Sequence, residues 1–114
     1  MDTDTKITKW ESQVRKGVFD FVILLCIEDE TFYGYELMRR IKDIAKIDVA
    51  EGTIYPLLNR LAKEGLVTSK WVEKESGMPR KYYQITTQGR QTLAGMKLSW
   101  RDFCTSIDQL LEHS

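Results

Sequence analysis

The sequence predicts a mainly α-helical fold with one β-hairpin, in the α+β class. Several long segments carry apolar residues at helical spacing, and two short segments rich in β-branched and aromatic residues flank a loop that contains Gly77 and Pro79. The chain has 114 residues, of which 42% are hydrophobic. This length fits one small domain with a limited core, so sharing a core with a second copy is a natural expectation.

The first helix is predicted to begin at Ile7, after a polar stretch, residues 1–6, that we expect to be flexible. From Val18 onward nearly every side of this helix is apolar, so that end is expected in the core, whereas the end that carries Trp10 needs cover from elsewhere. Asp20 interrupts the apolar stretch, which is too short to cross a bilayer and lacks a cleavage site. We expect a cytoplasmic protein without a membrane segment.

Two shorter helices are predicted next, over residues 35–45 and from near Thr53 to Gly65. Pro56 has no backbone donor, so it costs least in a first turn, with Gly52 or Thr53 as the cap. Gly65 stands where a C-terminal cap is expected. The inward positions of the earlier helix are predicted to be Leu37, Met38, Ile41, Ile44 and Ala45.

The last helix is predicted to have Thr87 as its N-cap and to run to Ser114. Its apolar residues repeat at alternating steps of three and four, a heptad seam narrower than the stripe of a helix that packs only on its own domain. We therefore expect it to pack along a long helix of a second copy. The predicted homodimer interface comprises Ile7, Trp10, Val14, Leu93, Met96, Trp100, Phe103, Ile107 and Leu110.

Three helices followed by a hairpin is the element order of a winged helix-turn-helix, in which the third helix enters the major groove of double-stranded DNA and the hairpin lies along the backbone. Asn59 and Arg60 can bind base edges, and Thr53, Tyr55 and Lys63 can hold phosphates. An ordinary solvated helix face explains this segment equally well.

The hairpin favours the DNA interpretation. Lys74 lies at one end of its loop, and Arg80 and Lys81 lie at the other, where a wing meets phosphates. Lysine also protects exposed strand edges, so these residues have a second explanation. The whole chain carries 17 basic and 17 acidic residues, so only this local charge argues for nucleic acid.

Catalysis has little support in the sequence. The single histidine, His113, is next to the C-terminus, and no glycine-rich phosphate loop is present. Cys26 and Cys104 are far apart without metal-ligand spacing, which favours two buried thiols. We expect no enzyme activity, no cofactor and no metal.

Trp100 lies on the heptad seam with Met96 and Phe103, and it is bulky for a two-stranded seam. It is either a core residue under the first helix, which spacing alone favours, or part of a cleft that takes a small ligand. Val14 of the first helix would line the same cleft.

The chain closely resembles the short members of the PadR family of bacterial transcriptional regulators. The resemblance rests on "YGYELMRRI" at 33–41, "EGTIYPLLNRLAKEGLV" at 51–67, "PRKYYQITTQGRQTL" at 79–93 and a tryptophan in the final helix. It extends over essentially the whole chain after the first few residues. One departure is Ala50, where such sequences often have a capping hydroxyl or amide.

The resemblance implies a dimeric winged-helix repressor that binds an inverted-repeat operator. Residues 7–86 would form the DNA-binding domain, with its first helix also in the dimer, and 87–114 the dimerisation helix. In multidrug-binding members a tryptophan at the position of Trp100 stacks on planar, often cationic compounds. The alternatives are a winged-helix module that binds protein and a repressor without a small-molecule effector. By position, the resemblance assigns DNA contacts to Tyr35, Thr53, Tyr55, Pro56, Arg60, Arg80 and Lys81.

Overall fold

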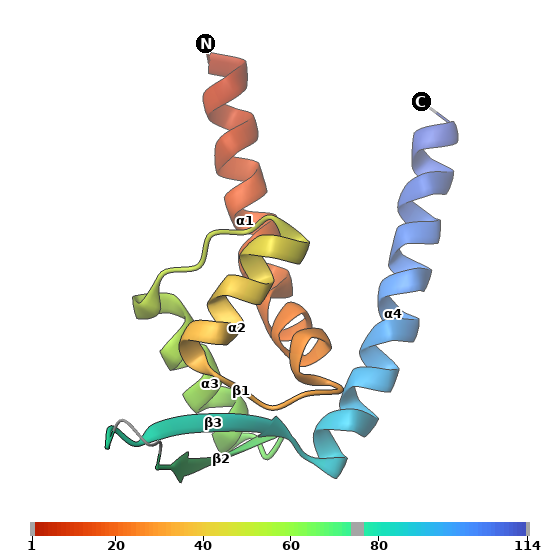
Figure 1. Cartoon of the computed structure of the whole chain (residues 1–114). Helices are drawn as coiled ribbons and strands as arrows, with labels where there is room; N and C mark the ends of the chain where they lie inside the picture. The colour runs from red at the N-terminus through yellow and green to blue at the C-terminus, as the bar shows by residue number, and fades with distance from the viewer. Residues whose placement is uncertain (1, 74–76, 114) are drawn as a thin grey trace.

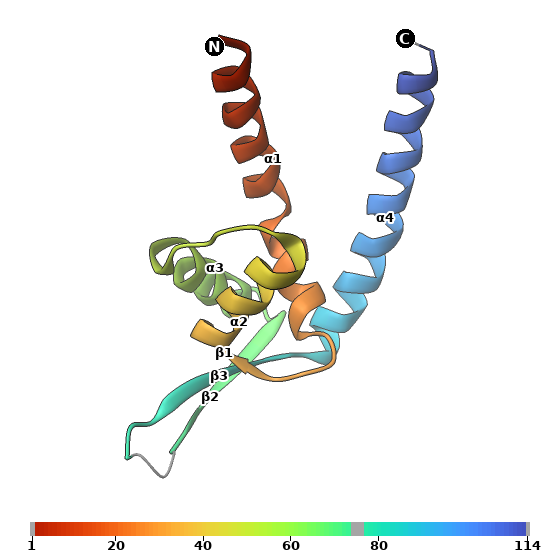
Figure 2. The same ribbon diagram turned by 45° about the horizontal axis from the view of Figure 1, so that its top comes forward.

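Two long helices project in the same direction from a body of shorter helices and a small sheet (Figure 1, Figure 2). This computed structural model describes residues 2–73 and 77–113. Within those ranges, no helix is long and apolar enough to cross a membrane. In chain order the elements are α1 (Asp2–Ile27), β1 (Phe32–Tyr33), α2 (Gly34–Arg40), the π-helical turn η1 (Ile41–Ala45), α3 (Glu51–Lys63), β2 (Val67–Val72), β3 (Arg80–Ile85) and α4 (Thr87–Glu112).

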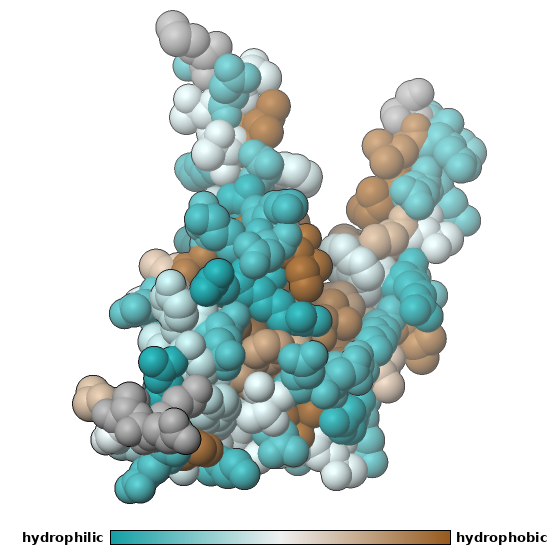
Figure 3. Space-filling model, in the orientation of Figure 1, coloured by the Kyte–Doolittle hydropathy of each residue, from teal (hydrophilic) through white to brown (hydrophobic). Residues whose placement is uncertain are grey.

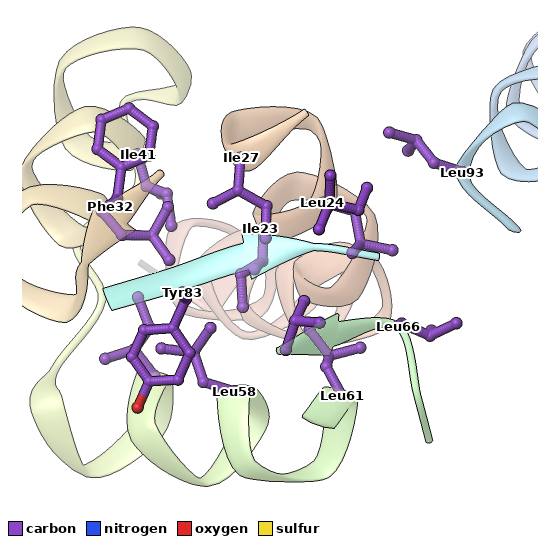
Figure 4. Close-up of a cluster of buried hydrophobic side chains, with 14 residues drawn as sticks. Ile23, Leu24, Ile27, Phe32, Ile41, Leu58, Leu61, Leu66, Tyr83 and Leu93 are labelled. Carbon is purple, nitrogen blue, oxygen red and sulfur yellow. The ribbon is translucent and has the colours of Figure 1, made fainter. Parts of the chain in front are cut away.

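The core lies where the apolar end of α1 meets α2, α3 and the sheet. Figure 4 shows side chains from α1, α3 and β3 converging, with Leu93 of α4 at the margin. Each fully buried leucine or isoleucine stabilises the fold by about 1.5–3 kcal/mol. This arrangement confirms the predicted winged helix-turn-helix. The largest fully buried side chains are Ile23, Leu24, Ile27, Leu37, Ile41, Ile54, Leu58, Leu61 and Leu93.

The sheet is antiparallel with strand order β1-β3-β2. β2 and β3 form the predicted hairpin, the wing, in which Val67 lies opposite Ile85. The strand β1, which the sequence did not predict, pairs Phe32 with Tyr83 and Tyr33 with Tyr82. Two residues are too few to show an alternating pattern. β1 nevertheless ties the start of α2 to the wing.

Two helix predictions differ from the structure. α1 begins at Asp2, whereas the sequence predicts a flexible stretch before Ile7; Asp2 and Asp4 in the first turn favour a helix start there through the helix dipole. Ile44 is 63% exposed, and Ala45 is exposed too, although both were predicted to face inward. The widened π-helical turn of η1 rotates these positions away from the core.

α3 begins earlier than predicted, with Ala50 as its N-cap, so the prediction of Gly52 or Thr53 is wrong. Ala50 offers no side-chain acceptor; its carbonyl instead accepts from the backbone nitrogens of Thr53 and Ile54, both at 3.0 Å. Pro56 therefore lies in the second turn of α3, one turn after Gly52 on the same face of the helix. Proline has no backbone donor for the Gly52 carbonyl, and this is tolerated because Gly52 is exposed to water.

Gly65 ends α3 as predicted. It has φ +79°, and its nitrogen donates to the Ala62 carbonyl at 3.1 Å while that of Leu66 donates to Leu61 at 3.0 Å. This pair of hydrogen bonds is the Schellman motif, which favours glycine because its φ is left-handed.

The start of α4 is tightly docked on the turn after α3. Its N-cap is Thr86, one residue before the predicted Thr87: the Thr86 hydroxyl accepts from the Gly89 nitrogen at 2.9 Å and donates to the Gly65 carbonyl at 2.6 Å. A Cβ at Gly89 would lie 2.1 Å from the Leu66 carbonyl oxygen. We call these contacts the α4 junction.

We predict that Gly89→Ala lowers the free energy of unfolding by about 2–3 kcal/mol, because the new methyl group must push apart two backbone segments that cannot move independently. Urea denaturation followed by circular dichroism would measure this. Gly95→Ala, in the same helix, is the control: a Cβ there meets nothing within 4 Å, so it should be neutral or stabilising by up to about 1 kcal/mol. Equal effects of the two substitutions would contradict the prediction.

Candidate nucleic-acid interface

A groove of about 500 Å³ lies between α3, the start of α2 and the wing; we call it the wing-side groove. Four of the predicted DNA-binding residues come together here from two elements that are distant in sequence. They are Tyr55 and Asn59 of α3 and Arg80 and Lys81 of β3; the remaining lining residues are Tyr33, Gly34, Trp71, Pro79 and Tyr83.

The Tyr55 ring lies against Gly34, the first residue of α2. A Cβ at Gly34 would lie 2.5 Å from Cε1 of this ring and 2.6 Å from its hydroxyl oxygen. The absence of a side chain at Gly34 therefore sets the position of Tyr55. Burial raises the pKa of the Tyr83 hydroxyl, and the neighbouring Tyr55 raises it further.

Aromatic rings hold the cations of the wing. The Arg80 guanidinium lies 4.4 Å from the centre of the Tyr33 ring, and the Lys81 ammonium lies 5.9 Å from that of Trp71 and 5.8 Å from that of Tyr83. Such contacts restrain a cation while leaving its donors available. Sequence reasoning missed Tyr33 and Trp71, although pairing Trp71 with Lys81 in a hairpin register would have indicated the latter.

Tyr35, predicted to contact DNA, is 52% exposed at the start of α2. Its ring stacks on that of Tyr33, with the centres 6.5 Å apart, and Tyr33 in turn meets the edge of Tyr82 at 5.6 Å. The predicted residue thus belongs to a layer of rings that joins α2 to the wing.

Three other predicted residues of α3 do not line the wing-side groove. Thr53, Pro56 and Arg60 border a second groove of about 460 Å³, the α1-side groove, together with Lys16 and Phe19 of α1. α3 therefore presents predicted DNA-binding groups on two flanks.

Lys63 and Lys74 complete the predicted DNA-binding set. Lys63 is exposed on the last turn of α3. Lys74 lies outside the described residues.

Most of the predicted dimer interface is exposed in the single chain. Leu93 is buried, whereas Trp10, Phe103 and Leu110 are 63%, 59% and 68% exposed. Figure 3 shows hydrophobic residues along both projecting helices. We call the projecting parts, residues 2–17 and 98–112, the arms. Ile7, Val14, Ile107 and Trp100 are exposed as well, and Met96 is partly buried.

A groove of about 320 Å³ lies between α1 and α4 near the base of the arms; we call it the arm groove. Trp100 lines it and is 40% exposed, with its ring 5.8 Å from that of Phe21 and 6.4 Å from that of Phe103. Met96 also lines the groove, whereas Val14, predicted at the same site, does not. Below the groove, the Lys97 ammonium binds the Glu28 carboxylate at 2.7 Å.

The two cysteines are free thiols, each partly buried. Burial raises the pKa of Cys26, and the nearby Arg40 guanidinium opposes this rise.

A winged helix whose third helix and hairpin share a groove of aromatic and cationic side chains is the arrangement found in DNA-binding regulators. The chain belongs to the PadR-like family of transcriptional regulators, whose family model matches residues 23–95.

Crystal structures of family members agree with this assignment over nearly the whole chain. A PadR family regulator from Eggerthella lenta is 31% identical with a TM-score of 0.90, covering 100% of this chain and 99% of its own. A PadR-like regulator from Bacillus cereus is 40% identical, with a TM-score of 0.78 and coverage of 87% and 96%. A PadR-like factor from Bacteroides fragilis is 35% identical, with a TM-score of 0.76 and coverage of 90% and 98%.

We predict that Gly34→Ala displaces the Tyr55 ring and leaves the fold intact, because the obstructed atoms are the mobile end of a side chain and the free energy of unfolding should change by less than about 1 kcal/mol. The aromatic NMR signals of Tyr55 report the displacement. Gly52→Ala, where a Cβ meets nothing within 4 Å, should leave them unchanged. Unaltered Tyr55 signals in Gly34→Ala would contradict the prediction.

Proposed function

We propose that this PadR-family regulator is a cytoplasmic repressor, which binds an inverted-repeat operator as a homodimer and is released by a planar aromatic or cationic small molecule. The observation that carries the proposal is the wing-side groove, where Tyr55 and Asn59 of the recognition helix meet Arg80 and Lys81 of the wing. In the proposed complex α3 enters the major groove and the wing follows the phosphate backbone.

The groups on α3 suit two kinds of DNA contact. The Asn59 amide can donate to and accept from an adenine edge, and the Tyr55 hydroxyl, fixed against Gly34, can donate to a phosphate. Arg80 and Lys81 neutralise phosphates without distinguishing sequences. α3 would therefore supply specificity, and the wing would supply affinity.

The homodimer is supported by the apolar residues of the arms. Leucine, isoleucine and tryptophan side chains at heptad spacing remain exposed on α4, and Trp10 is exposed on the arm of α1. Packing against a second copy removes this surface from water, which gives each buried side chain about 1.5–3 kcal/mol. The two recognition helices would then lie about 34 Å apart, one turn of DNA.

The arm groove supports a small-molecule effector at the dimer interface. Phe21, Trp100 and Phe103 offer ring faces, and the groove of about 320 Å³ lies near the size range of ligand pockets. Ring faces attract planar cations through their quadrupole. A ligand stacked on Trp100 would change the angle between the arms and with it the spacing of the recognition helices.

We predict that Arg80→Ala with Lys81→Ala weakens binding to operator and random duplexes about equally. Loss of two phosphate contacts should lower the slope of log K against log salt by about 1.8. Fluorescence anisotropy across a salt series measures both quantities, with Lys6→Ala plus Lys9→Ala, on the arm of α1, as the charge-matched control. An unchanged slope would contradict the proposal that the wing contacts DNA phosphates. Failure of the wild type to bind its own upstream DNA at low salt would favour a protein-binding module.

We predict that Ile107→Asp with Leu110→Asp raises the dimer dissociation constant at least tenfold, because each substitution places a charge where an apolar side chain should be buried, at a cost above about 1.4 kcal/mol. Light scattering at micromolar concentration gives the mass. Gln109→Asp, on the same turn, is the control and should remain dimeric. A monomeric wild type would contradict the dimer proposal.

We predict that planar cationic dyes quench the tryptophan fluorescence of the protein and that Trp100→Phe loses most of this quenching. Trp10→Phe and Trp71→Phe are the matched controls, since those rings lie on the arm of α1 and on the wing, away from the arm groove. Equal quenching in Trp100→Phe would place the dye elsewhere. No quenching by a broad panel would favour a repressor without an effector.

A further inference from the structure

Arg60 of the recognition helix is held by a carboxylate from another helix. Its Nη2 donates to Oδ1 of Asp20 on α1, and its Nε lies 3.4 Å from Oε1 of Glu64, the C-cap of α3. The Arg60 and Asp20 side chains are 52% and 36% exposed, so water and DNA can reach the pair. The guanidinium therefore points to the α1 flank of α3, away from the wing-side groove.

Asp20 is unusual in its position. It is the charged residue within the apolar run of α1, and its chain neighbour Phe19 is buried in the body. Arg60, the partner of Asp20, lines the α1-side groove with Lys16 and Thr53, whose side chains suit a phosphate. The Asp20 carboxylate therefore occupies an anion-binding position of the Arg60 guanidinium beside this groove.

We propose that Asp20 is a specificity-determining residue, which acts by positioning Arg60. This proposal rests on the proposed DNA-binding function of α3. On a non-cognate duplex Arg60 stays paired with Asp20, and its charge adds little attraction to the backbone. At the operator, a bidentate contact with a guanine edge replaces the carboxylate.

The energetics allow this exchange. An exposed ion pair in water is weak, since solvent screens it, so a stronger contact can displace the carboxylate. A phosphate on a random duplex is an anion like the carboxylate, so exchanging Asp20 for it replaces one charged partner with a similar one and gains little free energy. At the operator, the guanine edge presents two acceptors to the guanidinium in register with the other contacts of α3, so the exchange there adds a base contact to the complex. Asp20 therefore lowers non-specific affinity more than specific affinity.

The test is Asp20→Asn, with binding measured by fluorescence anisotropy on a duplex from the region upstream of its own coding sequence and on a random duplex of equal length. We expect affinity for the random duplex to rise about three- to tenfold at low salt, and the salt slope to steepen by about 0.9, because Arg60 gains one phosphate contact. Affinity for the upstream duplex should rise less, so the specificity ratio falls.

Two controls isolate the role of Arg60. Asp29→Asn removes the same charge from the exposed loop after α1 and should leave the specificity ratio unchanged. In an Arg60→Ala background, Asp20→Asn should have no further effect on the random duplex. Thermal unfolding by circular dichroism verifies that each variant is folded.

The outcomes separate this proposal from the function on which it rests. If the wild type binds the upstream duplex specifically but Asp20→Asn has the same effect with and without Arg60, the positioning role of Asp20 is overturned and DNA binding stands. The positioning role is also overturned if Asp29→Asn changes the specificity ratio as much as Asp20→Asn does. If the wild type binds neither duplex at low salt, both proposals fail.

Discussion

The geometry of the whole molecule depends on the close approach of Gly89 to the backbone of Leu66. Without a side chain at Gly89, the first turn of α4 lies directly on the turn that ends α3, and the hydrogen bonds of Thr86 hold it there. The Glu28–Lys97 ion pair then joins the end of α1 to α4. These contacts fix the direction in which both arms leave the body, and the arms are the surface on which a second copy would dock.

α3 is divided by its surroundings into three faces with different partners. Ile54, Leu58 and Leu61 are buried in the core. Tyr55 and Asn59 face the wing-side groove, and Arg60 faces α1. Because α3 is held on three faces, it has little freedom to rotate. A displacement of α1 would therefore change the contacts of Arg60, and a displacement of the wing would change those of Tyr55 and Asn59.

The fold was predictable because its main features are local in the sequence. Helical periodicity placed α1 to α4, β-branched and aromatic residues placed the wing, and Gly65 marked the end of α3. β1 was not predictable, because it is defined by pairing with Tyr82 and Tyr83, far along the chain. The π-helical turn η1 was not predicted either, because the apolar spacing of residues 35–45 indicates one continuous helix. The cap of α3 was missed because Ala50 has no side-chain acceptor, the feature that marks an N-cap in a sequence.

The grouping of some candidate residues could be predicted from the sequence, whereas the contacts of others could not. Tyr55, Asn59, Arg80 and Lys81 meet in one groove, as their positions on helix and wing indicated. The orientation of Arg60 could not be foreseen, because its partner Asp20 is 40 residues away and is brought near only by the packing of α1 beside α3. Trp71 and Tyr33 were missed because their roles come from cross-strand and ring contacts.

One turn of α1, residues 17–21, borders both the arm groove and the recognition helix. Gly17 and Phe21 line the arm groove, while Asp20 on the adjoining face binds Arg60. If a compound bound in the arm groove shifts this turn of α1, occupancy of the groove and engagement of Arg60 would be thermodynamically linked. Such linkage is reciprocal: the factor by which a bound compound lowers the affinity for DNA equals the factor by which DNA lowers the affinity for the compound. Operator-bound and free molecules of this regulator would then respond to different concentrations of the same compound.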